Sequence, residues 1–376
     1  MLPSLLAQVR VLSVGHTLPA MYGIPALRDL GAEVTLIEAP AAASVAARYA
    51  SLAGVFPTRS LLAGTGRCTI NLRDPRGRAA YLRLARQADV IFEGFRPGTS
   101  ARLGIDYDTV KAANPGVIYA AISGYGQEGP ARDRVGHDLN FLAAAGVLHL
   151  ADGPNGPPGV PGAPFADGLA GLSAALNVVA ALWRRAQTGT GCFLDIAIVD
   201  GPAFLMAMEY DFFRDSGRHR QRGDTHLCGG YPWYHIYETA DGRHVSVAAV
   251  EPQFYARLCT VIGRPDLATR QYAEGAEREA LFASFAAIFK SKTRDEWTAI
   301  VRDQDVCVEA VAAPGEAAAA LALRHGGAVT ADAVRSPIRL PAAAASGPPD
   351  TAATLASFGF TEDEIRSLQA HGSVGD

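Results

Sequence analysis

The sequence predicts a two-domain α/β protein, in which a large domain with a Rossmann-like open parallel sheet is followed by a smaller α+β domain. In the first half of the chain, short apolar runs typical of buried strands alternate with helical stretches. Such alternation indicates parallel strands joined by right-handed helical crossovers. From about residue 229 the pattern changes to a hairpin followed by helices. The length of 376 residues fits two domains of roughly 150 residues each.

The large domain is expected to begin with a strand and to alternate from there. Strands are expected at residues 9–14, 34–37, 88–92, 117–122 and 193–196, and helices at residues 20–30, 76–87, 107–113 and 168–185. Gly31 ends the first helix, and the many glycines and prolines of residues 151–164 predict a loop. Because ligands of open α/β sheets bind at the carboxyl ends of the strands, we expect the functional site there.

The smaller domain is expected to open with a hairpin over residues 234–249, because Asp241-Gly242 is a turn signal between two strand-like runs. Helices are expected at 253–262 and 279–289. The alanine-rich stretch 312–345 is interpreted as a helix followed by a linker. Thr361 and Glu364 have the spacing of a capping box, which predicts a last helix. The predicted organisation is a large domain at 1–200, a linker at 201–224, a small domain at 225–320 and a return to the large domain at 321–376.

Composition limits the class of protein. The chain is 49% hydrophobic and 19% charged with a net charge of −4, which fits a substantial core and lacks the basic excess of a nucleic-acid-binding protein. Its five cysteines are dispersed without a CxxC pair, which argues against a disulfide framework and a structural zinc site. No signal peptide is recognised, and no run approaches 18 uninterrupted apolar residues, so no membrane span is expected. We therefore expect a soluble cytoplasmic protein.

General sequence motifs exclude several enzyme classes and leave three acid/base candidates. The patterns GxGxxG after the first strand, GxxxxGK[ST], HExxH and GxSxG are absent, which disfavours nicotinamide enzymes, P-loop enzymes, zinc proteases and α/β-hydrolases. His137, Asp167 and Glu251 remain. Each has a structural explanation by itself: a surface pair of His137 with Asp138, an N-cap at Asp167, and a helix start at Glu251 before Pro252.

Several strings, read together and in order, favour function over those structural explanations. They are IFEGFRPG at 91–98, RLG at 102–104, GYGQEGP at 124–130, DRVGHDLNF at 133–141 and AAVEPQFY at 248–255. This set resembles the α-methylacyl-CoA racemase branch of the family III CoA transferases (CaiB/BaiF), and the similarity runs from about residue 9 to 305.

The resemblance implies that His137 and Asp167 are the catalytic acid/base pair and that Glu251 supports His137. The family's transferases keep the aspartate as a nucleophile but lack the histidine, so His137 favours a racemase. The resemblance also implies an interlocked homodimer, with Glu251 meeting His137 across the interface, and an acyl-CoA substrate with no separate cofactor. It implies contacts to coenzyme A (CoA) from Leu72, Arg73, Asp74, Gly94, Phe95, Arg96, Arg102, Gly136 and Asp138.

Proton exchange next to a thioester suits these residue types. Removal of the α-proton gives an enolate, and inversion needs a base on one face of the carbon and an acid on the other. We expect N–H groups at the start of the helix opened by Asp167 to stabilise the enolate oxygen, with Gly168 allowing close approach. One departure concerns CoA: the family usually has an arginine where this chain has Ala39, which predicts weaker CoA binding.

Two alternatives stay open. One is CoA transfer between carboxylic acids, in which Asp167 forms a mixed anhydride and then an aspartyl-CoA thioester. The other is a non-catalytic thioester-binding homologue, suggested by Ala39 and the alanine-rich tail. The sequence does not identify the acyl group.

Overall fold

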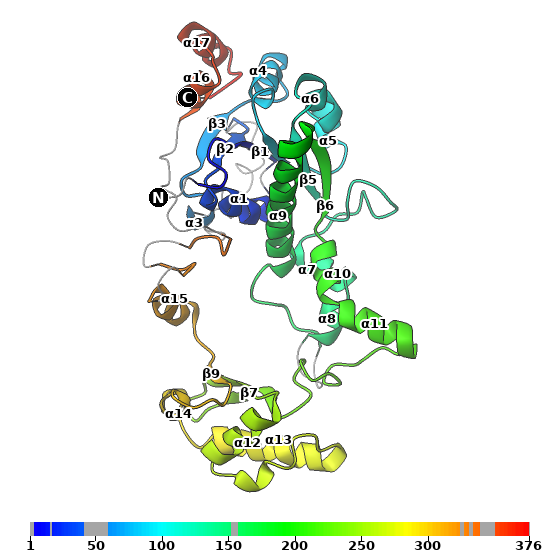
Figure 1. Cartoon of the computed structure of the whole chain (residues 1–376), viewed down its shortest axis with the longest axis vertical. Helices are drawn as coiled ribbons and strands as arrows, with labels where there is room; N and C mark the ends of the chain where they lie inside the picture. The colour runs from blue at the N-terminus through cyan, green and yellow to red at the C-terminus, as the bar shows by residue number, and fades with distance from the viewer. Residues whose placement is uncertain are drawn as a thin grey trace. The chain divides into compact units, whose positions relative to one another are not determined.

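The protein divides into two compact units (Figure 1). The computed structural model describes residues 4–15, 17–40, 59–151, 157–323, 327–330, 334–338 and 350–375. The large unit comprises Met1–Ala145, Gly162–Leu205 and Ala320–Asp376, and the small unit comprises Gly146–Pro161 and Met206–Ala319. The stretch 146–161, within the first predicted domain, thus groups with the small unit.

A six-stranded parallel sheet forms the centre of the large unit, in the order β3-β2-β1-β4-β5-β6. The strands are β1 (Arg10–Val14), β2 (Glu33–Glu38), β3 (Gly66–Thr69), β4 (Val90–Glu93), β5 (Ile118–Ser123) and β6 (Cys192–Ala197). The predicted open parallel sheet is therefore confirmed. The edge strand β3 was not predicted, because its four residues are mostly polar and only Gly66 and Cys68 are buried.

Helices cover both faces of this sheet. The buried residues of α4 (Pro75–Ala85), α6 (Tyr107–Ala113), α16 (Thr351–Ser357) and α17 (Glu362–Ala370) share one core with Leu12, Ile91 and Tyr119. The opposite face carries α1 (Leu18–Asp29) and α9 (Phe165–Thr188), which cross and contact each other (Figure 1). The expected capping box at α17 is confirmed, because Thr361 and Glu364 exchange hydrogen bonds of 2.8 and 3.3 Å.

The helices α1 and α9 approach backbone to backbone. A Cβ atom added to Gly171 would lie 2.4 Å from the carbonyl oxygen of Pro19, and one added to Gly23 would lie 2.7 Å from the carbonyl oxygen of Gly171. Both distances are too short for any side chain, so only glycine allows this contact. The close approach fixes the start of α9 against α1.

Among the described helices, α9 alone is long and apolar enough, by length and composition, to cross a membrane. It packs on α1, β5 and β6, and 44% of its most apolar stretch is buried. This is the packing of a core helix in an α/β domain, so its composition is weak evidence for a span.

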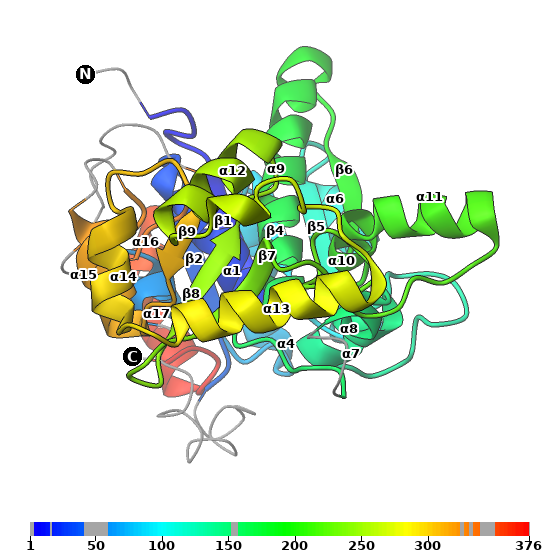
Figure 2. The ribbon, with the colours of Figure 1, turned by 90° about the horizontal axis from the view of Figure 1, so that it is seen from below.

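A three-stranded antiparallel sheet organises the small unit, in the order β7 (Tyr234–Glu238), β8 (His244–Ala248) and β9 (Val308–Ala310). The hairpin β7–β8 was predicted, and Gly242 adopts a φ of 74° at its turn. Helices α12 (Pro252–Val261), α13 (Gly275–Phe289) and α14 (Arg294–Val301) complete the core, and Figure 2 shows α13 running along the sheet. The smaller α+β domain is thus confirmed.

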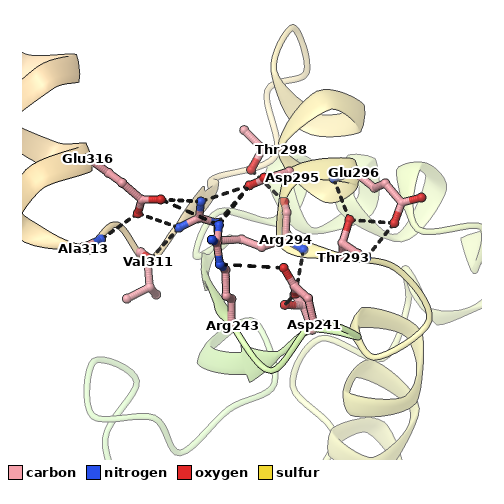
Figure 3. Close-up of polar contacts among 11 residues, drawn as sticks. Asp241, Arg243, Thr293, Arg294, Asp295, Glu296, Thr298, Val311, Ala313 and Glu316 are labelled. Carbon is pink, nitrogen blue, oxygen red and sulfur yellow. Dashed lines mark hydrogen bonds and ion pairs between the residues drawn. The ribbon is translucent and has the colours of Figure 1, made fainter.

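An ion-pair cluster joins α14 to α15 (Pro314–Ala322) in the alanine-rich stretch (Figure 3). The guanidinium of Arg294, which is 8% exposed, donates to the two carboxylate oxygens of Glu316 at 2.8 and 2.9 Å, and to Asp295 at 3.0 Å. The hydrogen bonds from Arg294, and then one from the Ala313 N–H, lower the pKa of Glu316 to about 2. The helix predicted here therefore exists over Pro314–Ala322, and much of the expected linker lies outside the described residues.

Candidate active site

Two helix starts in the large unit bring the acid/base candidates together. Helix α9 begins at Phe165, with Pro164 at the N-cap position. Asp167 is therefore the third residue of the helix, and its predicted N-cap position is wrong. The helix extends further because the Phe165 and Gly168 N–H groups find backbone acceptors, at Ala163 and Pro164. The Asp167 carboxylate is not needed as the helix cap.

The Asp167 carboxyl sits in surroundings that favour its protonated form. The residue is 8% exposed, and its backbone N–H donates to Oδ1 of Asp138 at 3.0 Å. Burial, and then the negative charge of Asp138, raise the pKa of the Asp167 carboxyl to about 7. A carboxyl with such a pKa can both accept and release a proton near neutral pH.

His137 is the N-cap residue of α7 (Asp138–Ala144). Its backbone N–H donates to Oδ1 of Asn140 at 3.0 Å, and the residue is exposed. The next residue, Asp138, accepts the hydrogen bond from the Asp167 backbone N–H. His137 therefore lies one residue away from the bond that joins the starts of α7 and α9. The structure thus brings two of the three acid/base candidates to one region of the large unit.

The first turn of α9 offers fewer free donors than the sequence suggested. Of its first four N–H groups, those of Phe165, Asp167 and Gly168 already bond to protein acceptors. The side of Gly168 where a Cβ would be is open, since an added Cβ meets no atom within 4 Å. The positive end of the helix dipole and an open approach therefore remain for a ligand.

Tyr22, which was not among the predicted residues, lies near enough to Asp167 and Asp138 for both charges to affect it. It lies on α1, and an added Cβ at Gly171 would be 2.8 Å from its Cβ. Burial first, and then the charges of Asp167 and Asp138, raise the pKa of the Tyr22 hydroxyl. No local signal in the sequence marks Tyr22, because its place depends on the packing of α1 against α9.

The loop after β4 carries three of the predicted CoA contacts. Gly94 is buried and has no room for a side chain, because an added Cβ would lie 2.2 Å from the carbonyl oxygen of Gly15. The ring of Phe95 lies over the same Gly15, where an added Cβ would be 2.7 Å from the ring. Arg96 is exposed and donates to the carbonyl oxygen of Asp133 at 3.1 Å. The loop is thus tightly seated on β1 while its arginine faces solvent.

Two guanidinium groups approach Gly98, at the end of this loop. An added Cβ there would lie 3.3 Å from Arg132 and 3.6 Å from Arg102. Arg102 also donates to the Thr99 hydroxyl at 2.8 Å. Two guanidinium groups near one backbone position suit phosphate oxygens, to which they can donate charge-assisted hydrogen bonds. Arg132 was not predicted, and only its approach to Gly98 in the fold distinguishes it from other surface arginines.

The other predicted CoA contacts differ in exposure and in hydrogen bonding. Asp74 caps α4: it accepts the Arg76 N–H at 2.8 Å and the Ser373 hydroxyl at 2.9 Å, which lower the pKa of its carboxyl. Leu72 packs on the adjacent core and Arg73 is exposed. Gly136 is tightly packed, since an added Cβ would lie 3.0 Å from Phe141.

Comparison with known proteins identifies the family of this chain. The sequence profile described as CoA-transferase family III matches residues 6–354. The chain belongs to the CoA-transferase family III.

Relatives within this family carry two different enzyme names. The chain is 32% identical to human α-methylacyl-CoA racemase over 305 residues, which cover 81% of this chain and 76% of that protein. It is 34% identical to succinyl-CoA–D-citramalate CoA-transferase of Chloroflexus aurantiacus over 272 residues, 71% and 67% of the two chains. A solved CAIB/BAIF family protein from Brucella suis shares the fold with a TM-score of 0.79 and 26% identity, over 94% of this chain and 99% of that chain. The family is enzymatic, and both reactions occur among the relatives' names.

Glu251, the third acid/base candidate of this family III chain, lies in the small unit. It is the exposed N-cap residue of α12, and its side chain makes no capping hydrogen bond. After burial, its charge is the next cause that raises the pKa of the Cys307 thiol. Its expected meeting with His137 stays a prediction. Across the described residues, no group of three or more His, Cys, Asp and Glu side chains is arranged to hold a metal ion.

Proposed function

We propose that this member of the CoA-transferase family III racemises or epimerises 2-methylacyl-CoA thioesters, with His137 and Asp167 exchanging the α-proton through an enolate. The observation that carries the proposal is the buried Asp167 carboxyl, whose pKa is raised to about 7, bonded through its backbone to the residue that follows His137. Human α-methylacyl-CoA racemase is among the relatives, which supports the same reaction.

In the proposed reaction, His137 and Asp167 act on opposite faces of the α-carbon. In one direction the Asp167 carboxylate removes the proton and protonated His137 returns one to the opposite face, and in the other direction the roles exchange. The enolate oxygen gains stabilisation from the positive end of α9, next to the open side of Gly168. Asp138 orients Asp167 by holding its amide.

CoA transfer is the second candidate, because transferases also occur among the relatives. In that reaction the Asp167 carboxylate attacks the thioester carbonyl and CoA leaves as a thiolate, giving a mixed anhydride. A nucleophilic carboxylate must be ionised to attack. The base of proton exchange needs the same ionised form, but the raised pKa of Asp167 also lets the carboxyl return a proton near neutral pH, a role that the transfer steps do not use.

The proposal also covers how the acyl-CoA substrate is bound and how the subunits assemble. Arg96, Arg102 and Arg132 would hold the phosphates of the acyl-CoA, and no separate cofactor takes part. We expect a cytoplasmic, interlocked homodimer in which Glu251 of the partner subunit supports His137. Exposed apolar side chains on α9 fit a protein interface there, since Leu176 is 65% and Trp183 is 71% exposed.

The test is incubation of the enzyme with (2R)-2-methylacyl-CoA in heavy water. Racemisation predicts deuterium at the α-carbon together with the 2S product, both dependent on His137 and Asp167. Transfer predicts instead that hydroxylamine traps Asp167 during turnover with an acceptor acid. If no 2-methylacyl-CoA exchanges its α-proton, the proposed reaction is wrong.

A further inference from the structure

Glu93 is a buried carboxyl group that the proposed chemistry does not use. It is the last residue of β4 and is 3% exposed. Burial, the larger cause, raises the pKa of its carboxyl to about 7, against the opposing effect of its hydrogen bonds. In the part of the chain that the structure describes, no arginine or lysine pairs with it. A buried carboxyl without a cation is costly, so its hydrogen bonds indicate what it does there.

Two of those hydrogen bonds lead to the loop that carries the predicted CoA contacts. Oε1 of Glu93 accepts the backbone N–H of Phe95 at 2.8 Å. The Ser100 hydroxyl, in α5 (Thr99–Leu103), donates to the same carboxyl group. The loop between these two bonds, residues 94–99, presents Arg96 and ends where Arg102 and Arg132 approach Gly98. One carboxyl group thus holds both ends of the loop.

The remaining neighbours of Glu93 are aromatic hydroxyl groups of the core. The Tyr119 hydroxyl donates to the carbonyl oxygen of Ile105 at 3.0 Å and lies 3.5 Å from Oε2 of Glu93. Tyr81 is fully buried, and its hydroxyl has no hydrogen-bond partner among the described residues. Tyr119 therefore has an acceptor other than Glu93, whereas the Phe95 amide depends on Glu93.

We infer that Glu93 is a positioning residue for CoA: its carboxyl group holds residues 94–99 so that Arg96 and Arg102 meet the phosphates. The inference rests on the proposed acyl-CoA substrate. Glu93 acts through the loop and touches no reacting atom, so its loss affects binding of CoA and leaves the proton-exchange step intact.

Three variants separate this role from a general contribution to folding. Glu93→Leu removes both hydrogen bonds to the loop. Glu93→Gln keeps an amide oxygen that accepts the Phe95 N–H. Tyr81→Phe is the matched control, because it removes a buried hydroxyl from the same core that has no hydrogen-bond partner among the described residues.

Coenzyme A binding by calorimetry and the kcat and KM of α-proton exchange are measured for each variant. We expect Glu93→Leu to weaken CoA binding about tenfold, the effect of losing a hydrogen bond to a charged group, and to raise KM in parallel at near-constant kcat. Glu93→Gln should recover most of the affinity, and Tyr81→Phe should bind CoA like the wild type. If Glu93→Leu does not fold, Ser100→Ala replaces it and should weaken CoA binding several-fold.

The inference is overturned if folded Glu93→Leu, or Ser100→Ala in its place, binds CoA with wild-type affinity. It is equally overturned if Tyr81→Phe weakens binding as much, or if the wild type does not bind CoA. A wild type that binds CoA but exchanges no α-proton refutes the proposed reaction alone, and the calorimetric comparison still decides the role of Glu93.

Discussion

The backbone N–H of Asp167 donates a 3.0 Å hydrogen bond to Oδ1 of Asp138, so one carboxylate joins the starts of α9 and α7. Asp138 thereby does two things to Asp167: it fixes the backbone of the residue, and its charge helps to raise the pKa of the carboxyl. His137 is its immediate neighbour in the chain. The relationship supplies both the geometry and the electrostatics on which the proposed proton exchange depends.

Removal of either acid/base group should stop exchange. We expect His137→Ala and Asp167→Asn each to lower α-deuterium incorporation by about 10²–10⁴, the usual contribution of a positioned acid or base. Mass spectrometry of the recovered acyl-CoA measures this, and calorimetric CoA affinity is the control that should stay unchanged. Wild-type rates of exchange in either variant would contradict the assignment.

Asp138→Asn should change the pH profile of exchange. The variant keeps an oxygen acceptor for the Asp167 amide but loses the negative charge that helps to raise the pKa of Asp167. The acid limb of the rate profile, in the direction where Asp167 is the base, should therefore move to lower pH. Burial remains as the larger cause, so the shift should be partial. An unmoved limb would show that Asp167 does not set it.

The raised pKa of Asp167 should also make the stability of the folded protein depend on pH. Its pKa is raised from 3.8 to about 7 in the folded protein, so the folded state binds the proton more tightly than the unfolded chain. This contribution is complete below about pH 4 and is lost as the pH rises through 7. Asp167→Asn should therefore gain stability relative to the wild type between pH 4 and 8. Thermal melts across that range measure the difference, and a pH-independent difference would contradict the raised pKa.

Two glycines on α9 should respond differently to alanine. Gly171→Ala places a Cβ 2.4 Å from the carbonyl oxygen of Pro19 and should destabilise the protein by about 1–3 kcal/mol through overpacking. Gly168→Ala has open space and should preserve or raise the melting temperature, because alanine favours helices. The added methyl group should nevertheless slow exchange, since it occupies the proposed approach of the thioester. Equal melting temperatures for the two variants would contradict the close α1–α9 contact.

Arg132 should contribute to CoA binding. Arg132→Ala removes one of the two guanidinium groups at Gly98 and should raise the KM for acyl-CoA roughly tenfold, with a weaker dependence of binding on salt. Arg134→Ala is the matched control, because that guanidinium lies over the ring of Tyr125 instead. Similar losses in both variants would indicate a general effect of positive charge.

The sequence alone was enough to predict the architecture wherever the information is local or periodic. Alternating apolar runs predict the parallel sheet, the Asp241-Gly242 turn predicts the β7–β8 hairpin, and the Thr361 capping box predicts α17. Strand β3 escaped prediction because an edge strand with an exposed Arg67 lacks a continuous apolar run.

Contacts between distant segments were decided only by the tertiary structure. The sequence placed Asp167 at an N-cap, whereas the fold begins α9 at Phe165 and bonds the Asp167 amide to Asp138. The neighbours of Tyr22 and the tie from Glu93 to Phe95 likewise depend on which helices and strands pack together. Local sequence determines which segments form helices and strands, but burial and charge at a site arise from atoms that only the packed chain brings within reach.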